Sequence, residues 1–139
     1  PQEYDIISTA LISENYAYIG GRSEELDAYI VKAYDMEGNH LLTFGEKGKD
    51  GDDWIAYVSQ IMEIPEGFFG IDANMRDLYI WGPDASVLGS VEAPDLFGAR
   101  YAWIAGAAKQ DDGSILVALT QDRDDDSATE LLLYRLSGF

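Results

Sequence analysis

Short apolar segments separated by polar turns recur along the whole chain. The apolar segments are rich in Ile, Val, Tyr, Phe and Trp, which pack well on the pleated surface of a β-sheet. The intervening turns contain Gly, Asp, Asn and Pro, which favour the backbone of tight turns. The pattern predicts strands at residues 6–12, 16–20, 28–34, 40–44, 57–64, 68–71, 77–81, 86–91, 103–109, 114–119 and 130–136.

These strands fall into three groups that share one layout, with four, four and three strands. In each group an aromatic residue is followed four positions later by a small one, at Tyr34/Gly38, Trp81/Ala85 and Tyr134/Gly138. The copies are roughly 50 residues apart, a period typical of β-propeller blades, each an antiparallel sheet of about four strands. We therefore predict an all-β chain with blades at about residues 6–45, 57–92 and 103–139.

Residues 34–48 are similar in sequence to a known repeat element. Residues 34–48 read Tyr-Asp-Met-Glu-Gly-Asn-His-Leu-Leu-Thr-Phe-Gly-Glu-Lys-Gly. This segment resembles the aromatic-Asp-x-x-Gly-x-hydrophobic-x-x-x-Phe-Gly element of NHL-repeat and related six-bladed β-propellers. Residues 81–90 resemble a second copy, and residues 134–138 resemble the start of a third. The resemblance implies a ring of blades, of which this chain supplies three.

Three blades cannot close such a ring, because strand edges and an apolar blade face would stay exposed. We expect either a segment of a longer propeller or a homo-oligomer that completes the ring. The alternative fold is an antiparallel sandwich or barrel of about ten strands, which explains the strand content but not the alignment of Tyr34, Trp81 and Tyr134. Because the chain starts at Pro1 and not at Met, we expect an upstream segment to have been removed, which leaves an extracytoplasmic location open.

The net charge of the chain limits the classes of molecule that it is expected to bind. There are 26 acidic residues against 9 Lys and Arg, so the net charge is −17. Such a surface repels phosphate backbones and anionic lipid, which argues against nucleic-acid and membrane-surface binding. Cysteine is absent, which excludes disulfides, zinc–cysteine sites and thiol catalysis. No apolar run approaches the roughly 18 residues that a membrane span requires.

The connecting segments differ in length in a regular way. Turns after the first and third strands of each group are short, whereas the other connections are long, at residues 20–27, 45–56, 71–77, 92–101 and 121–128. In a propeller the long connections share one face, which we call the long-loop face. It holds more than half of the 26 acidic residues, so we expect it to contact a protein, a small ligand or a cation.

Five residues on the long-loop face are candidates for ligand binding. Three arginines could converge on an anionic ligand, and two aromatic residues are expected nearby: Arg22, Arg76 and Arg100, with Trp54 and Tyr101. The competing role for the arginines is ion pairing within an acidic surface.

A cluster of acids at residues 122–126 suggests a metal site. Asp122, Asp124 and Asp126 alternate, so their oxygens can converge on one hard cation such as Ca²⁺. The segment does not match the EF-hand pattern, and a solvated charged loop is the favoured interpretation.

The sequence contains no strong catalytic motif. His40 is the only histidine and is expected on the surface, and no Gly-x-Ser-x-Gly elbow is present. We therefore predict no catalytic residue and a non-enzymatic binding or scaffold function. The alternative, implied by the resemblance, is a lactonase-like hydrolase with a divalent ion at the channel mouth. Asp72 and Asn74 are the only loop pair that matches its ligand types.

Overall fold

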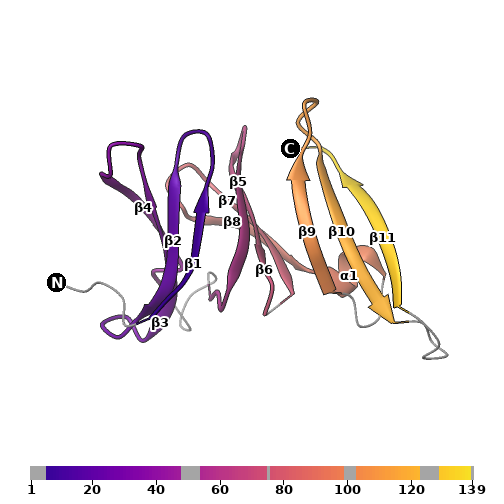
Figure 1. Ribbon diagram of the computed structural model, residues 1–139, viewed down its shortest axis with the longest axis horizontal. Helices are drawn as coiled ribbons and strands as arrows, with labels where there is room; N and C mark the ends of the chain where they lie inside the picture. The colour runs from indigo at the N-terminus through magenta and orange to yellow at the C-terminus, as the bar shows by residue number, and fades with distance from the viewer. Residues whose placement is uncertain (1–5, 48–53, 75, 99–102, 123–128, 139) are drawn as a thin grey trace.

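The described residues of the computed structural model are 6–47, 54–74, 76–98, 103–122 and 129–138, and they form three antiparallel sheets and one short helix (Figure 1). Sheet A contains β1 (Ile6–Ile12), β2 (Ala17–Ser23), β3 (Ala28–Tyr34) and β4 (His40–Phe44). Sheet B contains β5 (Val58–Ile64), β6 (Gly67–Asp72), β7 (Asp77–Trp81) and β8 (Val87–Glu92). Sheet C contains β9 (Trp103–Lys109), β10 (Ile115–Asp122) and β11 (Thr129–Leu136).

Strands that follow one another in the chain are neighbours in each sheet. Because all pairs are antiparallel, turns after first strands lie at the opposite end from connections after second strands, as Figure 1 shows for sheets A and B. The prediction of an all-β chain with four, four and three strands is confirmed. None of the three sheets closes into a barrel over the described residues.

The repeat seen in the sequence has a backbone counterpart. The small residue of each aligned pair adopts a left-handed conformation, with φ of 88° at Gly38, 65° at Ala85 and 99° at Gly138. Glycine adopts positive φ readily but alanine rarely does, so the positive φ of Ala85 at the aligned position supports a common turn geometry. Gly38 and Ala85 stand shortly before β4 and β8, the fourth strands of their sheets.

Two apolar layers hold the sheets together. Between sheets A and B five of the eleven buried side chains are aromatic, and the ring of Phe44 lies 5.1 Å from that of Phe68 and 5.0 Å from that of Trp81. Between sheets B and C they are mainly aliphatic, with Ile71, Leu78, Ile115, Val117 and Leu119 nearly inaccessible to solvent. Sheet B is therefore the middle layer and is covered on both faces (Figure 1).

Polar contacts connect each sheet to the next at or near its first strand, which is β1, β5 or β9. The β1–β2 turn reaches β5, where Ser13 Oγ donates to Glu63 Oε1 at 2.6 Å. Lys109, at the end of β9, donates from Nζ to the carbonyl oxygen of Glu63 at 2.8 Å. Strand β5 thus contacts a neighbour on either side, and the first strands of the three sheets lie next to one another.

The two outer sheets expose apolar side chains on the faces that point away from sheet B. On sheet C the exposed fractions are 56% for Trp103, 67% for Leu131 and 70% for Leu133. On sheet A, Ile12 is 80% exposed while its neighbour Leu11 packs toward sheet B. We call these surfaces the end faces of sheets C and A.

The single helix of the described residues, α1 (Ala93–Phe97), links sheet B to sheet C. Pro94 stands in its first turn, and Gly98 ends it with a left-handed φ of 61°. Ala93 is fully buried, and the Phe97 ring lies 4.6 Å from that of Tyr134 in β11. These contacts place α1 beside the last strand of sheet C.

Candidate functional site

Arg22 of the long-loop face has a local partner. Its guanidinium donates to the carboxylate of Asp27 at 2.5 Å, across the β2–β3 connection. The two side chains are 51% and 72% exposed. An exposed pair of this kind contributes about 0–1 kcal/mol, and it leaves the arginine directed at a neighbour on its own sheet.

Arg76 has a different partner, on another sheet. It sits in the β6–β7 connection with a positive φ of 58°. Its guanidinium carbon lies 5.3 Å from the centroid of the Trp103 ring at the start of β9. Its carbonyl oxygen accepts the N–H of Ala93 at 2.8 Å. Arg76 therefore links sheet B to β9 and α1, a role that sequence reasoning missed because Trp103 is distant along the chain.

Trp54, one of the two aromatic members of the candidate set, is 43% exposed, and its carbonyl oxygen accepts a hydrogen bond from the Tyr79 hydroxyl at 3.0 Å. Arg100 and Tyr101 lie outside the described residues. Arg22 and Arg76 thus each contact a partner of their own, Asp27 and Trp103. The five-residue ligand set stays a prediction.

The candidate Ca²⁺ loop lies mostly outside the described residues. The backbone of Asp122 ends β10 opposite Thr129 of β11, whereas Asp124 and Asp126 are not described. Over the part of the chain that is described, no group of three His, Asp or Glu side chains is placed to hold a metal ion. The metal site at this loop stays a prediction.

Asp72 is a buried structural carboxylate. It is fully inaccessible to solvent, and it accepts backbone N–H groups from Ala56 at 2.5 Å, Tyr57 at 3.2 Å and Asn74 at 3.0 Å. These bonds fasten the segment before β5 to the end of β6. Because the carboxylate oxygens already accept these three donors, the geometry does not favour the divalent-ion ligand pair that the family resemblance implied for Asp72 and Asn74.

Three acids face one another across the end of sheet B. Asp77 of β7 pairs in register with Asp72 of β6 on one side and with Glu92 of β8 on the other. Burial raises the pKa of Asp77 above its ordinary value, and the charges of Glu92 and Asp72 add to this effect. Like charges directly opposite in a sheet are destabilising, so this row weakens the fold when it is fully ionised.

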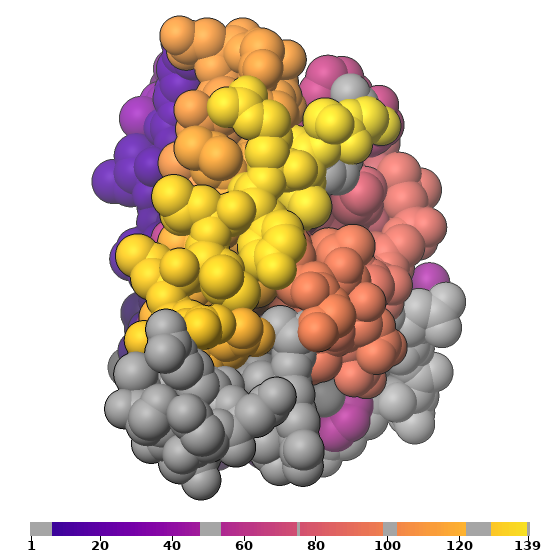
Figure 2. All heavy atoms as spheres, turned by 90° about the vertical axis from the view of Figure 1, so that its right-hand side faces the viewer, coloured from indigo at the N-terminus to yellow at the C-terminus, as the bar shows by residue number. Residues whose placement is uncertain are grey.

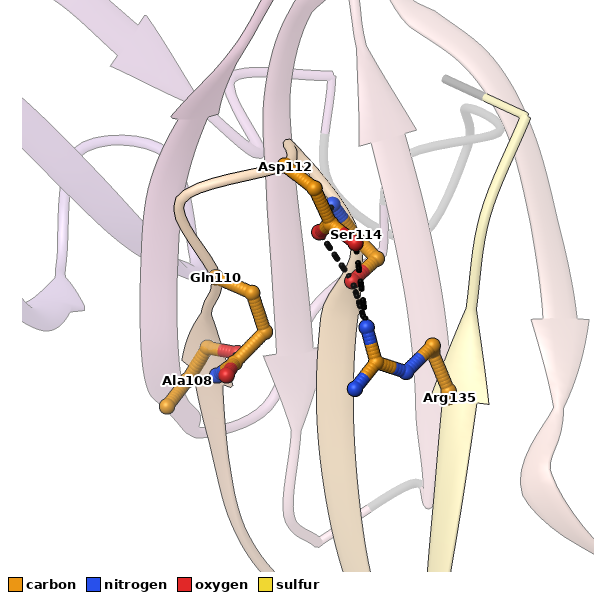
Figure 3. A network of polar contacts seen from close by, with 5 residues as sticks. All are labelled: Ala108, Gln110, Asp112, Ser114 and Arg135. Atoms are coloured by element: carbon orange, nitrogen blue, oxygen red, sulfur yellow. Dashed lines mark hydrogen bonds and ion pairs between the residues drawn. The ribbon is translucent and has the colours of Figure 1, made fainter.

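Other acids are used to shape turns. In the β9–β10 turn Asp112 accepts the N–H of Ser114 at 2.9 Å and its hydroxyl at 2.6 Å, while Arg135 of β11 donates to the second carboxylate oxygen at 3.0 Å (Figure 3). Asp84 makes the same two bonds to Ser86. These hydrogen bonds lower the pKa of both aspartates. His40 is exposed as predicted, and its Nε2 lies 3.0 Å from the carbonyl oxygen of Leu42.

A groove beside sheets B and C is a feature that sequence reasoning did not find. It has a volume of about 410 Å³ and runs between β11 on one side and sheet B with α1 on the other. Its lining is mainly apolar: Phe69, Leu78, Ile80, Val91, Leu96, Arg135, Leu136 and Ser137. Figure 2 shows β11 (yellow) next to the coral segment of β8 and α1 that borders this groove.

A smaller polar hollow lies between β4 and the β7–β8 turn. Its volume is about 180 Å³, and it is lined by Thr43, Glu46, Lys47, Asp84, Ala85, Ser86 and Val87. It is smaller than the roughly 300 Å³ at which small-molecule sites begin.

Comparison with known proteins gives no relative from which a function could be transferred: no protein-family model matches the chain, and no curated protein matches it. Within the described residues, no helix has the length and apolar character needed to cross a bilayer.

Proposed function

We propose that the chain is a non-enzymatic binding or scaffold module of a β-propeller protein, similar to NHL-repeat propellers. The observation that carries the proposal is the row of three antiparallel sheets, joined through their first strands and repeating one left-handed turn at Gly38, Ala85 and Gly138. Propeller blades are four-stranded antiparallel sheets arranged around a common axis, and sheets A and B have that strand number and order.

The exposed apolar side chains of the two end faces favour association of the chain with further sheets. Trp103, Leu131 and Leu133 are more than half exposed on sheet C, and Ile12 is on sheet A. Exposed apolar side chains of this size favour contact with a further sheet. In a ring each blade covers its neighbour, so the end faces are the surfaces at which the ring continues.

Light scattering of the purified chain tests this proposal. Only a second copy can cover the end faces in such a sample, so we expect a species of about twice 15.4 kDa that dissociates on dilution. Replacing Leu131 and Leu133 with Lys should abolish it, whereas Met36→Lys, at an exposed turn position, should not. A stable monomer with a clean two-state melt in all variants would reject the proposal.

The long-loop face is the proposed contact surface of the module. It is acidic, so the partner class it favours is a cationic protein segment, a cationic ligand or a hard cation. The buried, backbone-bonded Asp72 gives the hydrolase alternative no support.

A further inference from the structure

We propose that Asp112, followed by Gly113 in the β9–β10 turn, is a latent site of aspartate isomerisation that the hydrogen bonds of the folded chain hold inactive. The site is independent of the proposed ring and of the long-loop face, because this turn lies at the opposite end of sheet C from the β10–β11 connection. The modification needs no enzyme and no cofactor, since both reacting groups belong to the turn itself.

The reaction is an intramolecular condensation followed by a hydrolysis. The backbone nitrogen of Gly113 loses its proton and attacks the side-chain carboxyl carbon of Asp112. One carboxyl oxygen leaves as water, and a five-membered succinimide ring forms. Water then opens the ring at the main-chain carbonyl carbon, which leaves an isoaspartate whose main chain is one carbon longer. Glycine in the second position favours this reaction because it has no Cβ atom to obstruct ring closure.

The attacking nitrogen is engaged in the turn. The N–H of Gly113 donates to the carbonyl oxygen of Gln110 at 2.9 Å. Gly113 also holds a left-handed φ of 83°, which belongs to the hairpin geometry. Attack requires the nitrogen to lose its proton, so the hydrogen bond to Gln110 must break first.

The carboxyl group under attack is held in its unreactive form. Oδ1 of Asp112 accepts the N–H of Ser114 at 2.9 Å and its hydroxyl at 2.6 Å, while Oδ2 accepts Nη1 of Arg135 at 3.0 Å (Figure 3). Only a protonated carboxyl group readily loses an oxygen as water, whereas all three donors stabilise the carboxylate. The hydroxyl of Ser114, followed by its N–H and the charge of Arg135, lowers the pKa of Asp112.

The protection depends on the tertiary structure. Arg135 comes from β11, so it reaches Asp112 only while β10 and β11 are paired. Isomerisation in turn alters the structure, because the longer main chain moves the carboxylate away from Ser114 and Arg135. The turn before β10 then loses the hydrogen bonds that shape it.

The β7–β8 turn offers a matched position without the reactive neighbour. Asp84 accepts the N–H and the hydroxyl of Ser86, as Asp112 does from Ser114. Ala85 follows Asp84, and its Cβ atom hinders ring closure. The two turns therefore separate the effect of the hydrogen bonds from the effect of glycine.

The test follows isoaspartate formation in the purified chain during long incubation at neutral pH and physiological temperature. Chromatographic peptide mapping quantifies it at Asp112 and separates this position from Asp50, the other aspartate that precedes a glycine. A synthetic peptide of residues 108–118 serves as the unfolded reference, because it lacks Arg135. We expect Asp112 of the folded chain to isomerise at least tenfold more slowly than the peptide.

Two variants test the hydrogen bonds themselves. Ser114→Ala removes the hydroxyl donor, and Arg135→Gln removes the charge of a side chain that is 56% exposed. Each should raise the rate at Asp112 at least threefold while circular dichroism shows a folded chain. Ser86→Ala is the matched control, which should leave the rate at Asp112 unchanged and produce no isoaspartate at Asp84.

The proposal is overturned if the folded chain and the peptide isomerise equally fast, or if Ser114→Ala and Arg135→Gln behave like Ser86→Ala. Gly70→Ala, which crowds the packing between sheets A and B but leaves this turn intact, should isomerise like the parent. A rise in Gly70→Ala equal to that in Ser114→Ala would assign the protection to overall stability and would equally overturn the proposal.

Discussion

Replacing Gly70 with alanine tests the packing between sheets A and B. Gly70 lies in β6 beneath the indole of Trp81, and a Cβ atom there would lie 2.1 Å from Cζ3 and 2.6 Å from Cη2. The indole is fully buried and cannot move away freely, because Tyr79 stacks on it at 5.2 Å and Phe44 meets it edge-on at 5.0 Å.

The magnitude follows from the geometry. Forcing one extra methyl group into a well-packed core costs about 1–3 kcal/mol, and contacts this far below 3.0 Å place the change at the upper end. We therefore expect Gly70→Ala to lower the free energy of unfolding by about 3 kcal/mol, or the melting temperature by about 10 °C in a chain of this size.

Urea unfolding followed by circular dichroism provides the assay. Gly106→Ala is the control, since its Cβ atom would meet nothing within 4 Å, and it should be neutral or slightly stabilising. Trp81→Phe makes room beside Gly70, so the double variant should recover at least 1 kcal/mol relative to the sum of the single changes. The reasoning is refuted if Gly70→Ala and Gly106→Ala unfold at the same urea concentration.

Three further predictions concern charged groups. Asp77→Asn should stabilise the chain by about 0.5 kcal/mol at pH 7, because the raised pKa of Asp77 means that its ionised form disfavours the folded state. This gain, measured by urea titration, should vanish below pH 3.8, the ordinary pKa, where Asp77 is protonated in both states; an equal gain at pH 3 would contradict it. Arg76→Ala should cost about 0.5–1 kcal/mol by losing its contact with Trp103, and a double-mutant cycle with Trp103→Ala that shows no coupling would disprove the contact. Millimolar Ca²⁺ should raise the melting temperature if residues 122–126 bind it, and a flat titration, or one that Asp124→Asn leaves unchanged, removes the site.

The sheets and their order follow from local sequence signals. Alternating apolar residues and turn residues predict each strand, and the aligned pairs mark positions that the structure shows to have positive φ, including Ala85, where this conformation costs energy that a glycine would not lose. The repeat made this position visible even though alanine itself does not favour the conformation.

The parts that could not be predicted depend on contacts between distant residues. Helix α1 has only five residues, too short to show a helical period, and its docking depends on the contact between Phe97 and Tyr134. The groove is lined by residues of β6, β7, β8, α1 and β11, which only the fold brings together. Likewise, the contact of Arg76 with Trp103 depends on the fold, because the two residues are far apart along the chain.

A crystal structure of the purified chain at neutral pH tests the central claim most directly, since it shows what covers Trp103, Leu131 and Leu133. The account predicts another four-stranded sheet packed on sheet C in the way that sheet B packs on sheet A. Sheets A and C facing each other across one shared interior would contradict it.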